Sequence, residues 1–65
     1  MGDWIHTDEK VQVKTEGDMV LTIEEMDGYW FWSTYIGGRY VTGDDMGEYA
    51  YSETEAKMYA ELNSI

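Results

Sequence analysis

The chain has 65 residues and a formal net charge of −10 at pH 7, because fourteen acidic residues face only four basic ones. A chain this short forms one domain with a small core, and without cysteine it has neither a disulfide framework nor a Cys-based metal site. The charge argues against direct binding to nucleic acid or to an anionic membrane, while three Trp, six Tyr and one Phe argue for a folded chain rather than a disordered one.

Five strands are predicted after a loose lead-in formed by residues 1–8, in which Trp4 is the only large anchor. The evidence is an alternation of polar and apolar residues in some segments and a high content of aromatic and β-branched residues in others. The expected strands are residues 10–15, 19–24, 29–36, 39–42 and 48–51. Turn residues separate them, including Asp27-Gly28 and Gly37-Gly38, where glycine supplies a positive φ.

The Gly37-Gly38 loop also predicts a register. If these two glycines form the hairpin loop, the residues on either side pair in order across the two strands. The expected pairs are Ile36 with Arg39, Tyr35 with Tyr40, and Thr34 with Val41.

One helix is predicted from about residue 53 to residue 63. Ser52 and Glu55 form a capping box, in which the Ser52 hydroxyl accepts from the Glu55 amide and the Glu55 carboxylate reaches back to the Ser52 amide. Ala56, Tyr59, Ala60 and Leu62 then form an apolar stripe. We therefore expect residues 1–65 to be a single α+β domain, an antiparallel meander of about five strands with one C-terminal helix packed on one face.

Alternation divides the aromatic strand between the two faces of the sheet. Trp30, Trp32, Thr34 and Ile36 share one face with Val41; Tyr29, Phe31, Ser33 and Tyr35 share the other with Tyr40. One helix covers only one face, and the pattern does not decide which. The second aromatic face is either another core, covered by the hairpin that carries Val11 and Val13 or by Trp4, or an exposed protein interface, including that of a homodimer.

Residues 28–62 resemble a β-β-β-α pattern of phage and mobile-element proteins. The motifs are Gly28-Tyr29-Trp30-Phe31-Trp32, Gly37-Gly38, Gly47-Glu48-Tyr49 and Ser52-Glu53-Thr54-Glu55-Ala56. The pattern is similar to the arm-binding domain of tyrosine integrases, which lays such a sheet into a DNA groove. This resemblance implies the fold but not the DNA binding, because Arg39 is the only basic residue between Lys14 and Ala50, where the integrase domains carry basic side chains.

The residues give little support for catalysis, so we expect a protein that is not an enzyme and needs no cofactor. His6 is the only histidine, and the carboxylate pairs Glu24-Glu25 and Asp44-Asp45 would need a cleft to shift their pKa values. Asp44, Asp45 and Glu48 could offer oxygen ligands to calcium, but their spacing is not that of a calcium loop. An acidic turn is the favoured interpretation, and no metal is expected.

The acidity itself has three interpretations: salt or solubility adaptation, a generic acidic module for a basic partner, and DNA mimicry. Alternate carboxylates on a strand recur about every 6.6 Å, so a strand edge with its acidic loops could imitate a row of phosphates. In size and charge the chain resembles small acidic phage inhibitors of uracil-DNA glycosylase, restriction enzymes or CRISPR effectors. We predict such an inhibitor, acting on a basic nucleic-acid-binding host enzyme in the cytoplasm. The predicted contact residues are Glu24, Glu25, Asp27, Asp44, Asp45 and Glu48 for charge, and Tyr29, Phe31, Tyr35 and Tyr40 for aromatic contact.

Overall fold

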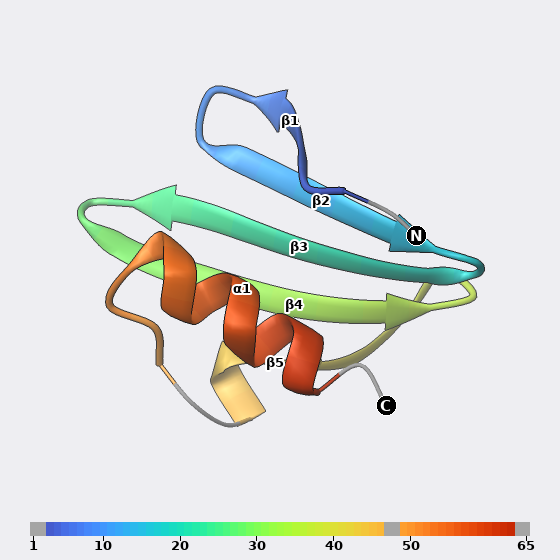
Figure 1. Cartoon of the computed structure of the whole chain (residues 1–65). Coiled ribbons are helices and arrows are strands. Elements are labelled where there is room, and N and C mark those ends of the chain that lie inside the picture. Colours follow the sequence, from blue (N-terminus) through green and yellow to red (C-terminus); the bar gives the residue numbers. More distant parts are fainter. Residues whose placement is uncertain (1–2, 47–48, 64–65) are drawn as a thin grey trace.

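A computed structural model describes residues 3–46 and 49–63 as a five-stranded antiparallel sheet with one helix lying across it (Figure 1). The strands follow one another in the sheet in chain order, β1 to β5. The elements are β1 (Ile5–Asp8), β2 (Val11–Glu16), β3 (Met19–Met26), β4 (Tyr29–Ile36), β5 (Arg39–Gly43), the 3-10 turn η1 (Asp44–Met46) and α1 (Glu53–Leu62). The predicted α+β meander with a C-terminal helix is therefore confirmed.

The two predicted glycine turns form as expected. Gly37 and Gly38 both have positive φ, at 59° and 81°, and so do Asp27 and Gly28, at 53° and 82°. These are the conformations that a tight hairpin turn requires at its two central positions. Aspartate is one of the few residues besides glycine that tolerates such a φ, so both turns follow from the local sequence.

Small residues on α1 allow it to lie close to the sheet. Ala56 and Ala60 are fully buried against a core that also contains Leu21, Ile23 and Trp32. The ring of Tyr59 lies 6.3 Å from that of Trp32. The helix therefore covers the face of β3 and β4 that carries Trp30, Trp32 and Thr34, which settles the choice that alternation left open. Leu62 does not extend the buried stripe, because it is 64% exposed.

One predicted strand was wrong and one strand was missed, although the number of strands was right. The loose lead-in predicted for residues 1–8 includes β1, which pairs Ile5 with Val13 and His6 with Gln12 on the free edge of β2. The side chains of β1 are all exposed, so no hydrophobic alternation marks it in the sequence. The strand predicted at residues 48–51 is reduced, within the described part of the chain, to one bridge between Ala50 and Trp30.

The register predicted for β4 and β5 was right at the turn and wrong beyond it. Ile36 pairs with Arg39 and Tyr35 with Tyr40, but Thr34 pairs with Thr42. Val41 is the extra residue of a β-bulge, which leaves it exposed and re-aims the rest of β5. A turn rule counts residues outward from the loop and cannot foresee an insertion.

The predicted helix start is confirmed with one change. The Glu55 amide donates to Ser52 Oγ at 3.1 Å, which is the expected N-cap. The Glu55 carboxylate reaches one residue further than predicted and accepts from the Tyr51 amide at 3.0 Å. This bond ties the segment that precedes the helix to the first helical turn.

Candidate functional site

The sheet face opposite α1 carries a mixed set of half-buried and exposed side chains. The strand register aligns them in rows across the sheet. One row is Ile5, Val13, Thr22, Ser33 and Gly43; on either side lie Val11, Glu24 and Phe31, and Thr15, Val20, Tyr35 and Tyr40. We call this surface the open face, because α1 packs on the other side of β3 and β4 (Figure 1).

Neither the hairpin that carries Val11 and Val13 nor Trp4 covers the open face, so these two candidates for a second core were wrong. Val11 and Val13 lie within the same sheet, beside the aromatic residues rather than over them. Trp4 lies on the helix side, where its Nε1 donates to Glu61 Oε2 at 3.1 Å and its ring contacts the Lys57 ammonium, 5.7 Å from the centroid. Within residues 3–46 and 49–63, the helix contacts β3 and β4 on the Trp32 face, so it does not cover the open face.

The four predicted aromatic contact residues share the open face but fall into two groups. Tyr35 and Tyr40 meet edge to face, with ring centroids 5.7 Å apart. Tyr29 and Phe31 lie toward the other end of β4. The small Ser33 separates the two groups.

Tyr49 and Tyr51 join the second group, although the sequence argument missed them. The antiparallel bridge between Ala50 and Trp30 sets Tyr51 beside Tyr29 and Tyr49 beside Phe31. Ala50 is buried, whereas Tyr29, Tyr49 and Tyr51 are 60%, 63% and 73% exposed. The sequence feature that could have identified them is the alternation Tyr49-Ala50-Tyr51, which places both tyrosines on the face opposite to Ala50.

These residues line a recess of about 190 Å³ at the edge of β4. It lies where Ala50 forms its bridge with Trp30 of β4. We call it the aromatic recess. Its lining is Tyr29, Trp30, Phe31, Tyr49, Ala50 and Tyr51. Three of the tyrosines expose most of their surface, which is uncommon for aromatic side chains that only fill a core.

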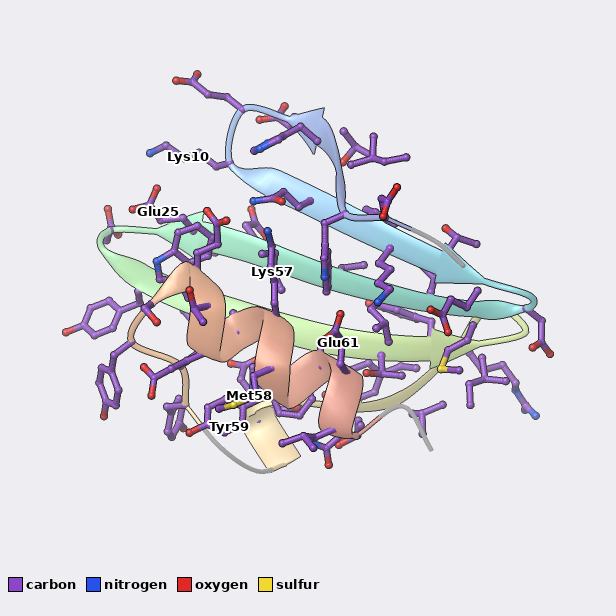
Figure 2. All side chains as sticks on the ribbon, viewed as in Figure 1. Lys10, Glu25, Lys57, Met58, Tyr59 and Glu61 are labelled. Carbon is purple, nitrogen blue, oxygen red and sulfur yellow. The ribbon has the colours of Figure 1, made fainter. Side chains whose placement is uncertain are left out.

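Carboxylates collect at the end of the sheet that contains the β1–β2 and β3–β4 turns. The Glu25 amide donates to the Lys10 carbonyl at 3.0 Å, which holds the two turns side by side; Figure 2 shows Lys10 and Glu25 at this end. We call this region the acidic end. Its acidic residues are Asp8, Glu9, Glu24, Glu25 and Asp27, and Lys10 is its only basic residue. None of these carboxylates forms a salt bridge within the described residues.

The opposite end of the sheet has a smaller excess of negative charge. The β2–β3 and β4–β5 turns meet there through the Gly37 amide, which donates to the Asp18 carbonyl at 2.9 Å. Glu16, Asp18 and Glu61 are accompanied there by Lys14 and Arg39, with Lys14 Nζ 3.6 Å from Glu16 and 2.8 Å from Glu61. The acidic end therefore has the larger excess of negative charge.

The predicted acidic residues are not all brought together. Glu24 projects onto the open face between Val11 and Phe31, while Glu25 points to the helix side. Asp44 and Asp45 lie in η1 at the β5 edge, with β4 between them and Glu24. Glu48 lies outside the described residues. Among the described residues, no strand carries carboxylates at alternate positions. The acidic end is therefore built mainly from turns and not from a row of carboxylates along one strand.

Asp45 has a structural contact of its own. The Tyr40 hydroxyl donates to Asp45 Oδ1. This hydrogen bond is the main reason why the pKa of Tyr40 rises to about 12, with desolvation and the charges of Asp45 and Asp44 adding to it. The Tyr40 ring therefore lies along β5 toward η1.

The described residues contain no cluster of three or more His, Asp or Glu side chains placed to hold a metal ion. His6 is exposed, and its Nδ1 lies 3.3 Å from the Asp8 carbonyl oxygen.

Within the described residues, no helix is long and apolar enough to cross a membrane.

Comparisons with known proteins found no similarity: no family model, no curated protein and no solved structure matches this chain.

Proposed function

We propose that this protein binds a basic nucleic-acid-binding enzyme at the surface that otherwise receives DNA, and so inhibits it by mimicry. The acidic end supplies the negative charge, and the adjoining open face supplies aromatic and apolar contact. The partner is a protein, and the inhibition is stoichiometric.

The observation that carries this proposal is the junction of the two surfaces at Glu24. This exposed carboxylate stands between Val11 and Phe31 on the open face and belongs to the acidic end. Interfaces of this kind combine charge, which accelerates the encounter, with desolvated aromatic contact, which slows dissociation. Solubility alone would explain the acidic surface but not the exposed aromatic surface beside it.

The charge also argues against a second copy of this chain as the occupant. Two copies that met through their open faces would bring two chains of net charge −10 together. Like charges at an interface cost several kcal/mol. A nucleic-acid-binding enzyme offers the opposite charge, because it neutralises phosphates with lysine and arginine.

Competition with DNA tests the proposal directly. Labelled duplex DNA is bound to purified uracil-DNA glycosylase, to a restriction endonuclease and to a CRISPR effector nuclease, and fluorescence anisotropy follows its displacement. We expect this protein to displace DNA from at least one enzyme at about one equivalent. Displacement from none of them contradicts the proposal.

Two charge-matched variants separate the site from net charge. The test variant is Glu24→Gln, Glu25→Gln and Asp27→Asn; the control is Asp3→Asn, Glu16→Gln and Asp18→Asn. Each removes three negative charges. We expect the test variant to need at least ~10-fold more protein for displacement, because close interfacial charges contribute about 1 kcal/mol or more. An equal loss in both variants would show that only total charge matters.

A further inference from the structure

The aromatic recess differs in chemistry from the rest of the open face. Its lining is almost entirely aromatic: Tyr29, Trp30, Phe31, Tyr49 and Tyr51, with Ala50 as the one other residue. Its volume of about 190 Å³ is several times the roughly 30 Å³ that one water occupies in the liquid. This is room for the head group of one side chain, and not for a folded segment.

Three carboxylate residues neighbour the residues that line the recess. Glu24 pairs across the strands with Phe31, and Asp27 lies two residues before Tyr29 in the turn. The carboxylate of Glu55 accepts a hydrogen bond from the Tyr51 amide at 3.0 Å. A nucleobase or other flat aromatic ligand gains nothing from these charges, and a phosphate is repelled by them.

A cation fits both features. The face of a tyrosine ring carries partial negative charge and attracts a cation within about 6 Å of its centroid. Arginine is the best match among the natural cationic side chains, because its guanidinium is planar, stacks on rings and is more weakly hydrated than the lysine ammonium. We propose that the aromatic recess receives an arginine side chain of the basic partner. This inference rests on the proposed function, since it names the group by which the partner is held.

Short peptides test the recess without any enzyme. The probes are acetyl-Gly-Arg-Gly-amide, the same peptide with citrulline, which is neutral and nearly isosteric, and the same peptide with lysine. The ring resonances of Tyr29, Tyr49 and Tyr51 are followed by NMR during each titration. We expect the arginine peptide to shift all three, with an affinity ~3- to 30-fold higher than that of the citrulline peptide, as a cation–π contribution predicts. The lysine peptide should bind more weakly than the arginine peptide.

Matched variants locate the binding. Tyr51→Leu should lose most of the arginine binding, while Tyr51→Phe keeps the ring and should retain most of it. Leu62→Ala, at an exposed position of α1 outside the recess, should leave the binding unchanged. Because Tyr51 is 73% exposed, its truncation should not alter the amide spectrum of the rest of the chain, which checks that the variant is folded.

The outcomes are distinct. Equal binding of arginine and citrulline peptides, or absence of shifts at the three tyrosines, overturns the arginine recess. If the protein still displaces DNA from an enzyme in that case, the proposed function stands alone. If the arginine peptide binds but no enzyme is inhibited, the recess stands and the proposed function falls.

Discussion

Glu61 on α1 accepts a hydrogen bond from Lys14 on β2, with the Nζ and Oε2 atoms 2.8 Å apart. The same Oε2 accepts from the Trp4 indole. Figure 2 shows Lys57 and Glu61 on one side of α1 and Met58 and Tyr59 on the other. The carboxylate of Glu61 therefore connects the helix to β2 and to the segment before β1, both in the half of the sheet away from β5. The bond to Lys14 is the main reason why the pKa of Glu61 is lowered, and it also raises the pKa of Lys14.

Replacing Glu61 should loosen this connection. We expect Glu61→Gln to lower the free energy of unfolding by about 1 kcal/mol or less, since the carboxylate is partly exposed and screened. Because the folded-state pKa of Glu61 is lowered, its contribution is present above the ordinary carboxyl pKa and is lost as pH falls through the lowered value. Urea denaturation followed by Trp fluorescence, at neutral and acid pH, measures both effects. The comparison variant is Glu53→Gln, which removes the Lys57 pair within α1 and should cost about 0.2–0.5 kcal/mol. A Glu61→Gln variant as stable and as acid-sensitive as the native chain would contradict this role.

The Tyr40 phenol should lose its proton at a higher pH than an ordinary tyrosine does. Its pKa of about 12 means that the folded state retains this proton where the unfolded chain loses it. The stabilisation is complete below the ordinary tyrosine pKa near 10 and is lost as pH rises through about 12. Asp45→Asn should bring the pKa of Tyr40 back toward the ordinary value, while Asp44→Asn should lower it less. NMR titration of the Tyr40 Cζ resonance provides the measurement, and identical titration curves for all three proteins would refute the assignment.

Gly43 is required by the packing around Tyr40. A Cβ atom added there would collide with the Tyr40 hydroxyl and would lie 2.9 Å from the Trp32 carbonyl oxygen. We expect Gly43→Ala to destabilise the fold by about 1–3 kcal/mol, the usual cost of overpacking, and to move the Tyr40 hydroxyl away from Asp45. The two readouts are the thermal unfolding midpoint and the Tyr40 titration. Gly38→Ala is an informative comparison, because no heavy atom lies within 4 Å of its added Cβ and only the positive φ opposes it.

The cap of α1 should contribute to stability through one hydrogen bond. Ser52→Ala removes the acceptor of the Glu55 amide and should cost about 1 kcal/mol. Thr54→Ala, at an exposed position in the first turn, serves as the control and should change stability by less than about 0.5 kcal/mol. Thermal unfolding by circular dichroism compares the two. Equal effects would mean that side-chain propensity, and not the cap, explains the loss.

Part of the candidate site was predictable because it depends on alternation within one strand. Tyr29, Phe31 and Tyr35 share a face through the period of two in β4 alone, and Tyr40 joins them through the glycine turn. The acidic turn at Asp27 was also visible, since aspartate before glycine marks a tight turn. The pairing of Ala50 with Trp30 was not, and without it Tyr49 and Tyr51 have no place in the site. Glu24 and Glu25 were grouped because they are adjacent, although adjacent strand residues point to opposite faces.

Local chemistry in the sequence determined the strands from β2 to β5, the glycine turns, the start of α1 and the net charge. Each of these depends on residues a few positions apart, whose preferences act before the chain collapses. The tertiary structure alone decided that Ile5–Asp8 adds an edge strand, that Val41 bulges, that α1 covers the Trp32 face, and that the acidic turns gather at one end beside the aromatic recess. The edge strand and the bulge depend on backbone pairing with the neighbouring strand, which the side-chain pattern does not mark. The position of α1 and the gathering of the acidic turns depend on contacts between segments far apart in the sequence, which no short stretch of sequence encodes.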